Sequence, residues 1–399
     1  MNKLFAHRDA RTYLAAQGLS LIGDNALWLA LGIWVKILTG SNSDAGLTFF
    51  AYILGLLLGP VGGLVADRVR RRPLLIVTNL VAGVGVCALL LVSGRGQLWL
   101  IYLVLFGYGA VSGLITSAQN ALLTVMLPDD LLGDANSLLH VGEVGLRIIT
   151  PLIGAGILAV AGAKPVILLD AFTFLAAGLA LCMLRVREPR VTPSGESWLA
   201  AMSGGLRHIR RTPALWRLQI SLVGALLVFG FFQVAEFAIV SQGLNRTPPF
   251  LGILETAMGA GAVFGGLVSA QLMRLSSERA LVVSSLAGAA IACPLLMTKW
   301  LPVVLVAMTV AGACIVWVEV AAITLVQRRT PKELVGRVSA AIMTMSMIPQ
   351  AISLGLGSAL IAIVNYRLLL LIMAIVFLAS AIQMAASDRE MVDTSAGVT

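Results

Sequence analysis

Apolar segments of about 20 residues follow one another along nearly the whole chain, and they constrain the fold more than any other feature of the sequence. A helix of that length crosses the roughly 30 Å hydrocarbon core of a bilayer. Hydrophobic residues make up 59% of the 399 residues and charged residues only 12%, whereas soluble domains are roughly 45–50% apolar and 25% charged. We therefore predict an all-α polytopic membrane protein.

These runs predict twelve membrane-spanning helices. The one long connection, roughly 186–215, is rich in Arg, Pro, Ser and Gly and has six predicted helices on each side. We expect an N-terminal six-helix bundle over 1–185, a cytoplasmic central linker over 186–215, a C-terminal six-helix bundle over 216–386 and a cytoplasmic tail over 387–399. The expected spans are 13–38, 45–66, 74–93, 98–127, 135–161, 165–185, 216–241, 249–272, 280–298, 301–326, 336–364 and 366–386.

The net charge of +9 reflects orientation in the membrane rather than a nucleic-acid surface. Of the 28 Lys and Arg residues, 21 lie in the termini, the linker and the loops on one side, and six lie in the opposite loops. Arg147 alone lies well inside an expected span, since every other basic residue is in a loop or close to the end of a span. Because basic residues concentrate on the cytoplasmic side, both termini and the linker are predicted to be cytoplasmic, and no nucleic-acid partner is expected.

The four cysteines predict no metal ion and no disulfide. All lie within apolar runs, and their spacing fits neither a metal site nor a pair of linked loops. We expect no cofactor. The polar, basic start, MNKLFAHRDARTYL, predicts no cleavable signal.

The two halves of the chain resemble each other at one shift, 203 residues. GGLV at 62–65 returns at 265–268, LPDDLLG at 127–133 aligns with TPKELVG at 330–336, and Gly154 aligns with Gly357. Six helices return the chain to its starting side, so both copies have the same topology. Parallel six-helix repeats around a central cavity are one of the plans of membrane transporters.

Residues 63–73, GLVADRVRRRP, resemble the signature G-x-x-x-D-R-x-G-R-R of the major facilitator superfamily (MFS). Arg70 stands where glycine is usual. SLIGDNALWLA (20–30), SAQNALLTVMLPDDLLGDANSL (117–138), LLDAFTFLAAGLAL (168–181) and SWLAAMSGGLRHIRRTPALWRL (197–218) are similar to the bacterial drug and siderophore exporters, among them macrolide-efflux and enterobactin-exporter proteins. GDNAL also resembles the lysophospholipid transporters. The matching signature positions are Gly63, Asp67, Arg68, Arg71 and Arg72.

The resemblance implies the MFS fold, with two six-helix repeats around a central cavity, and a secondary active transporter that works by alternating access. It implies proton-coupled efflux of an amphiphilic or lipophilic organic solute by a monomer in the bacterial inner membrane, in contact with membrane lipids. Lysophospholipid transport is the alternative. Two departures mean that proton antiport does not follow from the resemblance: the fourth helix has no arginine, and TPLIGAG (150–156) only partly matches the antiporter motif G-P-x-x-G-G.

Polar residues within the first and fourth spans are the first candidates for the solute site. Ionisable groups at membrane depth cost roughly 2.5–3.5 kcal/mol each, so they often mark a pathway. Gln17, Ser20 and Asp24 share one helix face, which Asn25 adjoins. We predict that this face lines the cavity and that Asp24 can carry the proton; the alternative is structural bonding to neighbouring helices. A second polar stripe is formed by Ser112, Thr116 and Asn120.

Other charged residues within the spans are also candidates for the cavity. Glu143 and Arg147 can pair along the fifth helix, either structurally or with Arg147 replacing the missing basic residue of the fourth helix. In the C-terminal half, Glu236 is a second candidate proton carrier. Asp170 and Glu255 lie close to expected helix starts, where a carboxylate suits the helix dipole, so a structural role is predicted for both. The remaining cavity candidates are Gln233 and Glu319.

The stretch that resembles the MFS signature, residues 63–73, also predicts a cytoplasmic gate. In the superfamily the loop between helices 2 and 3 packs against helix 11, so the resemblance implies that Asp67 meets Arg337 and the start of that helix. Gly63, Arg68 and Arg71 complete the gate motif.

Two other classes of protein are weaker alternatives. Asp129, Asp130 and Asp134 faintly resemble the metal-diphosphate motif of an intramembrane enzyme, but the sequence has no second such cluster. A membrane receptor without transport is the other alternative.

Overall fold

The computed structural model describes residues 8–59, 69–184, 198–331 and 334–386, together with positions 4, 62, 186 and 188. This part of the chain is helical and contains no strand. Within it, ten helices are long and apolar enough to cross a membrane. The prediction of an all-α polytopic membrane protein is confirmed.

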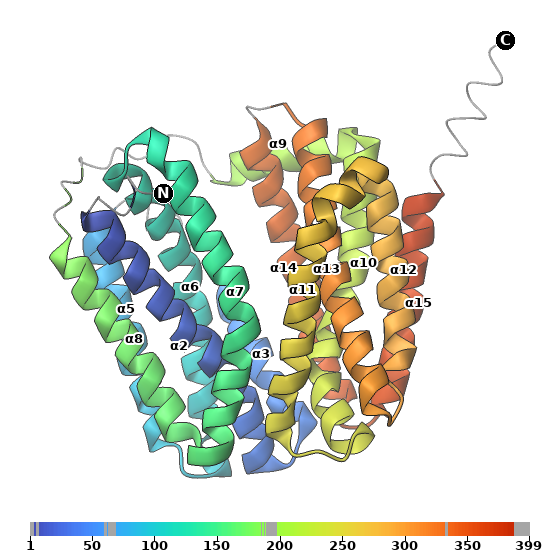
Figure 1. Cartoon of the computed structure of the whole chain (residues 1–399), viewed down its shortest axis with the longest axis horizontal. Coiled ribbons are helices and arrows are strands. Elements are labelled where there is room, and N and C mark those ends of the chain that lie inside the picture. The colour runs from blue at the N-terminus through green and yellow to red at the C-terminus, as the bar shows by residue number, and fades with distance from the viewer. Residues whose placement is uncertain are drawn as a thin grey trace. The chain divides into compact units, whose positions relative to one another are not determined.

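The helices follow the predicted spans (Figure 1). Those of the first half are α2 (Arg8–Thr39), α3 (Asn42–Leu56), α5 (Arg71–Ala88), α6 (Leu98–Met126), α7 (Asp129–Ala161) and α8 (Ala163–Met183). Those of the second half are α9 (Trp198–Arg211), α10 (Pro213–Ala238), α11 (Leu251–Leu275), α12 (Glu278–Leu295), α13 (Leu301–Arg329), α14 (Val335–Leu360) and α15 (Tyr366–Ala385). Neither α3 nor α7 is among the ten candidate membrane spans. The described part of α3 has only 15 residues, and the apolar part of α7 is limited to Ile149–Ala161.

Contacts divide the chain into two compact units. The N-terminal unit comprises Met1–Gly195 and Pro248–Thr256, and the C-terminal unit comprises Glu196–Thr247 and Ala257–Thr399. In the N-terminal unit α2 packs against α7 and α8, and α5 packs against α6 and α8. In the C-terminal unit α10 packs in the same way against α14 and α15, and α12 against α13 and α15. The two units therefore repeat one pattern of helix pairs.

Glycines bring the paired helices together at equivalent points of the two units. A Cβ atom on Gly154 of α7 would clash with the main chain of Ala26 on α2, and one on Gly357 of α14 would touch Phe231 on α10. Likewise Gly109 of α6 lies against Tyr52, and Gly312 of α13 lies against Met258. Helices can approach this closely only where small residues face each other.

The register of the repeat is not uniform along the chain. α6 and α13 begin at Leu98 and Leu301, and these fit the shift of 203 residues. By contrast, α5 and α12 begin at Arg71 and Glu278, which are a few residues further apart. A single shift of 203 residues therefore does not align the third helices of the two units, and the GGLV stretch at 62–65 lies largely outside the described residues.

The linker contains a helix that the sequence analysis did not predict. α9 packs against α10 and α14 and buries Ile209 completely. Leu206 and Ile209 lie on one side of it, while Arg207, Arg210 and Arg211 are exposed. Apolar residues three apart among arginines are the amphipathic signal that would have identified it.

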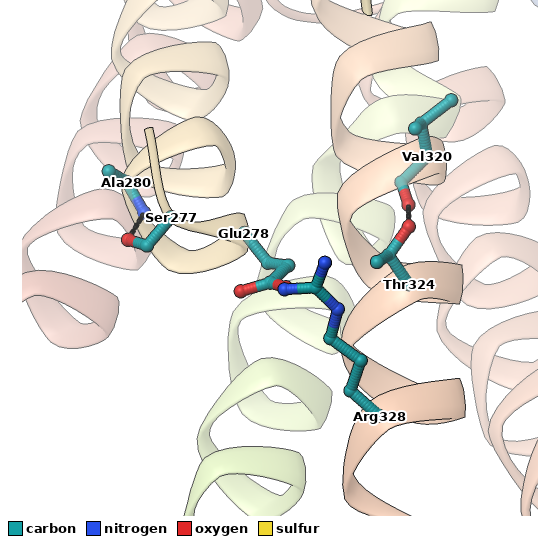
Figure 2. A network of polar contacts seen from close by, with 6 residues as sticks. All are labelled: Ser277, Glu278, Ala280, Val320, Thr324 and Arg328. Atoms are coloured by element: carbon teal, nitrogen blue, oxygen red, sulfur yellow. Dashed lines mark hydrogen bonds and ion pairs between the residues drawn. The ribbon is translucent and has the colours of Figure 1, made fainter. Parts of the chain in front are cut away.

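The start of α12 and the end of α13 are joined by an ion pair (Figure 2). Glu278 lies in the first turn of α12 and Arg328 in the last turn of α13, and their side chains meet. The hydroxyl of Ser277 caps α12 by accepting from the Ala280 main-chain N–H at 3.2 Å. Each charge also suits the dipole of its own helix end.

Candidate functional site

The N-terminal unit encloses a cavity of about 390 Å³. Residues of α2, α3, α5, α6, α7 and α8 line it. Pockets that combine apolar walls with a few polar groups are typical sites for small organic ligands. The polar part of the wall consists of Gln17, Ser20, Asp24, Tyr52, Asn79, Tyr108, Ser112, Thr116, Gln119 and Glu143.

Two carboxyl groups meet at this cavity. Asp24 on α2 lines it, and Asp170 on α8 is fully buried. The two side chains lie close enough to interact, and Tyr108 on α6 lies close to both. Asp24 Oδ1 and Asp170 Oδ2 are buried without a hydrogen-bond partner. Because buried polar atoms are nearly always paired, a proton or a bound ligand would complete this site.

Hydroxyl groups of the same helices hold the two carboxyls in place. Ser20 Oγ donates to Asp24 Oδ2 at 3.4 Å. The hydroxyl of Thr173 lies 2.8 Å from the main-chain oxygen of Asp170 and 3.4 Å from its Oδ1. Both partners lie three or four residues away on the same helix face, so the sequence of each helix sets the direction of its own carboxyl group.

Gly23 allows α8 to approach α2 at the carboxyl pair. A Cβ atom on Gly23 would lie 2.5 Å from Asp170 Oδ1 and would clash with the Thr173 hydroxyl. A larger residue at this position would therefore require Asp170 and Thr173 to move. Close packing of the two helices therefore depends on the glycine of the GDN stretch at 23–25.

Four described aromatic side chains line the cavity, namely Tyr13, Tyr52, Tyr108 and Phe174, and Trp28, which is not a lining residue, packs against one of them. Trp28 packs against Phe49 and Tyr52, with ring centroids 4.7 and 4.6 Å apart. Tyr108 lies 5.8 Å from both Tyr52 and Phe174. These separations are within the range of favourable ring pairs. A hydrogen bond of 3.3 Å joins the hydroxyls of Tyr52 and Ser112.

Most of the polar stripes predicted for the N-terminal half line this cavity. Asp24 and Glu143 do so, as do the neighbours predicted with them, Gln17, Ser20, Ser112 and Thr116. Asn25 does not: its amide donates to the Leu21 main-chain oxygen at 2.7 Å, because a residue next to Asp24 points about 100° away around the helix. The side chains of Asn120 and Arg147 lie outside the described part of the structure.

Asp170 was missed by the sequence analysis as a site residue. Its predicted role at a helix start is wrong, since α8 begins at Ala163 and Asp170 lies two turns further on. Tyr52 and Tyr108 were missed because tyrosines in apolar runs look like ordinary packing residues. A polar residue facing Gly23 could not be identified without knowing that α2 and α8 are neighbours.

The C-terminal candidates lie apart from the cavity of their own unit. Glu236 is buried on α10, Gln233 is half-buried on the same helix, and Glu319 is exposed on α13. A cavity of about 200 Å³ in this unit is lined by other described residues of α10, α12, α13 and α15. The assignment of Gln233, Glu236 and Glu319 to the solute pathway remains a prediction.

The signature motif is described only in part. Gly63, Asp67 and Arg68 lie outside the described residues, and Arg337 is half-buried on α14. Arg71 is the first residue of α5. The predicted gate between Asp67 and Arg337 therefore remains a prediction.

The described end of the motif ties α5 to α8 and to the linker. The Glu188 carboxylate accepts from the main-chain N–H groups of Arg71 and Arg72 at 2.6 and 2.8 Å. The side chain of Arg72 donates to the main-chain oxygens of Leu181 and Cys182, near the end of α8, at 2.8 and 2.7 Å. Each charged group thus satisfies main-chain groups that a helix end leaves unpaired.

Comparison with known proteins identifies the family. The sequence profile of the Major Facilitator Superfamily matches residues 13–354 and 239–390. The chain belongs to the major facilitator superfamily. Macrolide efflux protein A of Streptococcus pyogenes is 27% identical over 271 residues, which are 64% of this chain and 65% of that protein. Enterobactin exporter EntS of Escherichia coli O127:H6 is 26% identical over 348 residues, which are 85% of this chain and 82% of that protein.

Solved structures of other transporters share the fold. A bacterial homologue of the iron transporter ferroportin in an inward-facing state has a TM-score of 0.73 at 15% identity and covers 95% of this chain and 98% of its own. The POT family transporter PepTSo has a TM-score of 0.75 at 11% identity, and the match covers 96% of this chain and 98% of that chain. With its apolar helices, this MFS protein is a multi-pass membrane transporter and not an enzyme. Among the described residues, no three His, Cys, Asp or Glu side chains come together as a metal site would require.

Proposed function

We propose that this MFS protein exports an amphiphilic or lipophilic organic solute across the bacterial inner membrane in exchange for protons. The observation that carries the proposal is the buried pair of Asp24 and Asp170 at a cavity that is part polar and part aromatic. The transporter would work as a monomer by alternating access, with both termini and the linker in the cytoplasm.

The cavity wall and the two exporters similar to this chain both favour an organic solute with apolar and polar parts. Tyr and Phe rings beside hydroxyl and amide groups suit a ligand that has both apolar and polar parts. Two relatives are named as exporters of a macrolide and of enterobactin, both of which are organic compounds. Efflux of a solute of this kind is therefore the direction and the class that we propose.

The two carboxyl groups are the proposed site of proton binding during transport. Like charges a few ångströms apart repel strongly where the surroundings are not water. A single proton shared by Asp24 and Asp170 would remove the repulsion and supply a donor to their unpartnered oxygens. Asp24 lines the cavity and would exchange this proton with water, whereas Asp170 is enclosed and would stabilise the protonated pair.

Transport in proteoliposomes with an imposed pH gradient tests the proposal. We expect gradient-driven movement of a macrolide such as erythromycin by the wild type. Asp24→Asn and Asp170→Asn should lose the response to the gradient but retain exchange of labelled for unlabelled solute without a gradient. Asp9→Asn, on the same helix as Asp24 and outside the cavity wall, is the matched control. Full gradient-driven transport by both cavity variants would refute the proton assignment.

Lysophospholipid transport is the second candidate. It is favoured by the GDNAL stretch and by the nearly apolar cavity of the C-terminal unit. The same vesicles can be loaded with a labelled lysophospholipid in place of the macrolide. Movement of the lipid without movement of the macrolide would replace the proposed solute class by this one.

A further inference from the structure

The cavity of the C-terminal unit differs in chemistry from the cavity at Asp24. It has a volume of about 200 Å³ and is lined by α10, α12, α13 and α15. Phe229 and Phe232 lie on one wall, with ring centroids 6.0 Å apart, and Phe377 and Met373 belong to α15. None of the described residues that line it is charged.

The few polar atoms around this cavity offer almost nothing to a polar ligand. The lining hydroxyl belongs to Ser285 and already donates to the Leu281 main-chain oxygen at 2.6 Å. Cys293 and Cys314 contribute thiols, which behave as small apolar groups. A polar group placed here would lose its bound water without gaining a hydrogen-bond partner, which is unfavourable. The wall therefore selects against charged and hydrogen-bonding groups.

The size of the cavity fits a hydrocarbon group. An engineered apolar protein cavity of about 150 Å³ stays dry and binds benzene or xenon, so a volume of about 200 Å³ is sufficient for an aromatic ring with a short alkyl chain. The entrance is not sealed, because Ile315 is 39% exposed and Phe229 is half-buried.

We propose that this cavity is a binding site for an uncharged hydrocarbon group of the transported solute, either an aromatic ring or a branched alkyl chain. That the bound group belongs to a transported solute rests on the proposed function. That the cavity binds an apolar compound does not depend on it. It gives the C-terminal unit a role in substrate selection that is separate from the polar contacts at Asp24.

Thiol protection in lipid nanodiscs tests the proposal with butylbenzene as the probe. Cys293 and Cys314 line the cavity, while Cys87 and Cys182 are exposed and serve as an internal reference. At ten times its dissociation constant, butylbenzene should slow N-ethylmaleimide labelling of the cavity thiols about tenfold. Labelling of Cys87 and Cys182 should change little, which separates occupancy of the cavity from a general effect on the bilayer.

Filling the cavity should abolish this protection. Ala289 on α12 lines it, and Ala287 on the same helix does not. We expect Ala289→Phe to lose the effect of butylbenzene and Ala287→Phe to retain it. If the native thiols react too slowly, Ile315→Cys at the entrance supplies an accessible thiol. Equal labelling of that cysteine with and without butylbenzene would overturn the proposal.

Transport by the same variants separates the two proposals. Ala289→Phe should reduce export of a solute with an aromatic ring more than Ala287→Phe does. Probe binding in a protein that moves no solute would leave the cavity assignment standing and refute the proposed function. Transport without protection by the probe would refute the cavity assignment alone.

Discussion

Arg72 and Arg279 make the same contact in the two units of the transporter. Each is the second residue of its helix, α5 or α12, and each donates through Nε and an Nη to two main-chain oxygens at the end of a neighbouring helix. Arg72 bonds Leu181 and Cys182 of α8, and Arg279 bonds Met384 and Ala385 of α15. These oxygens belong to the last turn, where carbonyl groups lack the N–H donor four residues further on that the rest of the helix supplies.

Removing either arginine should destabilise its own unit. Arg72→Ala and Arg279→Ala should each cost about 1–2 kcal/mol, because a cation is lost from a helix C-terminus together with two hydrogen bonds. Arg→Lys should recover only part of this, since an ammonium group lacks the planar fork of the guanidinium. Thermal unfolding in detergent measures the effect. Arg211→Ala, at an exposed arginine of α9, is the comparison, and a loss as large as that of Arg72→Ala would argue against a specific role for these caps.

Glu188 of the linker supplies the start of α5 with a carboxylate, whereas α12 has an acidic residue in its own first turn. The first turn of α5 contains no acidic residue, and the linker provides one from more than 100 positions away. In α12 the acidic residue of the first turn is Glu278. A carboxylate at a helix start that accepts two main-chain N–H groups contributes about 1 kcal/mol.

Glu188→Gln should therefore loosen the start of α5. We expect faster hydrogen exchange at the amides of Arg71 and Arg72 and little change in the middle of the helix. Glu278→Gln is the comparison, because its partner Arg328 is mainly exposed, with 67% of the side chain accessible, and such pairs contribute only about 0–1 kcal/mol. Unchanged exchange at both amides in Glu188→Gln would mean that the carboxylate does not cap α5.

Gly154 and Gly357 are equivalent in the repeat but should differ in how well they tolerate substitution by alanine. A Cβ atom on Gly154 would clash with the main chain of Ala26, whereas one on Gly357 would lie 3.0 Å from the ring edge of Phe231 and no closer than 3.2 Å to any main-chain atom. Main chain cannot move aside as a ring can, so Gly154→Ala should cost more, about 1–3 kcal/mol. Folded yield and thermal unfolding measure the difference. Gly156→Ala, which has nothing within 4 Å, should be neutral or slightly stabilising.

The sequence predicted those features that depend on residues close together along the chain. Apolar runs gave the helices, and spacings of three and four placed Ser20 beside Asp24 before the structure placed both on the cavity wall. Features that depend on which helices are neighbours could not be predicted. Asp170 joins Asp24 only because α2 and α8 pack together, and Glu188 reaches α5 from a linker whose position no local pattern encodes. The single repeat shift failed near α5 and α12 because it assumes equal loop lengths in the two halves.

Gly23 provides the test of whether the contact of α2 with α8 matters for coupling. Gly23→Ala places a methyl group where Asp170 Oδ1 and the Thr173 hydroxyl now lie, so it should move Asp170 away from Asp24 without removing either carboxyl group. We expect the response of transport to a pH gradient to fall at least about tenfold, which corresponds to about 1.4 kcal/mol of coupling free energy. Exchange without a gradient should persist, because the polar wall contributed by α6 is unchanged. Gly18→Ala, on the same helix with nothing within 4 Å, should couple normally. If Gly23→Ala folds and responds fully to the gradient, the proximity of the two carboxyl groups is not what couples transport to protons.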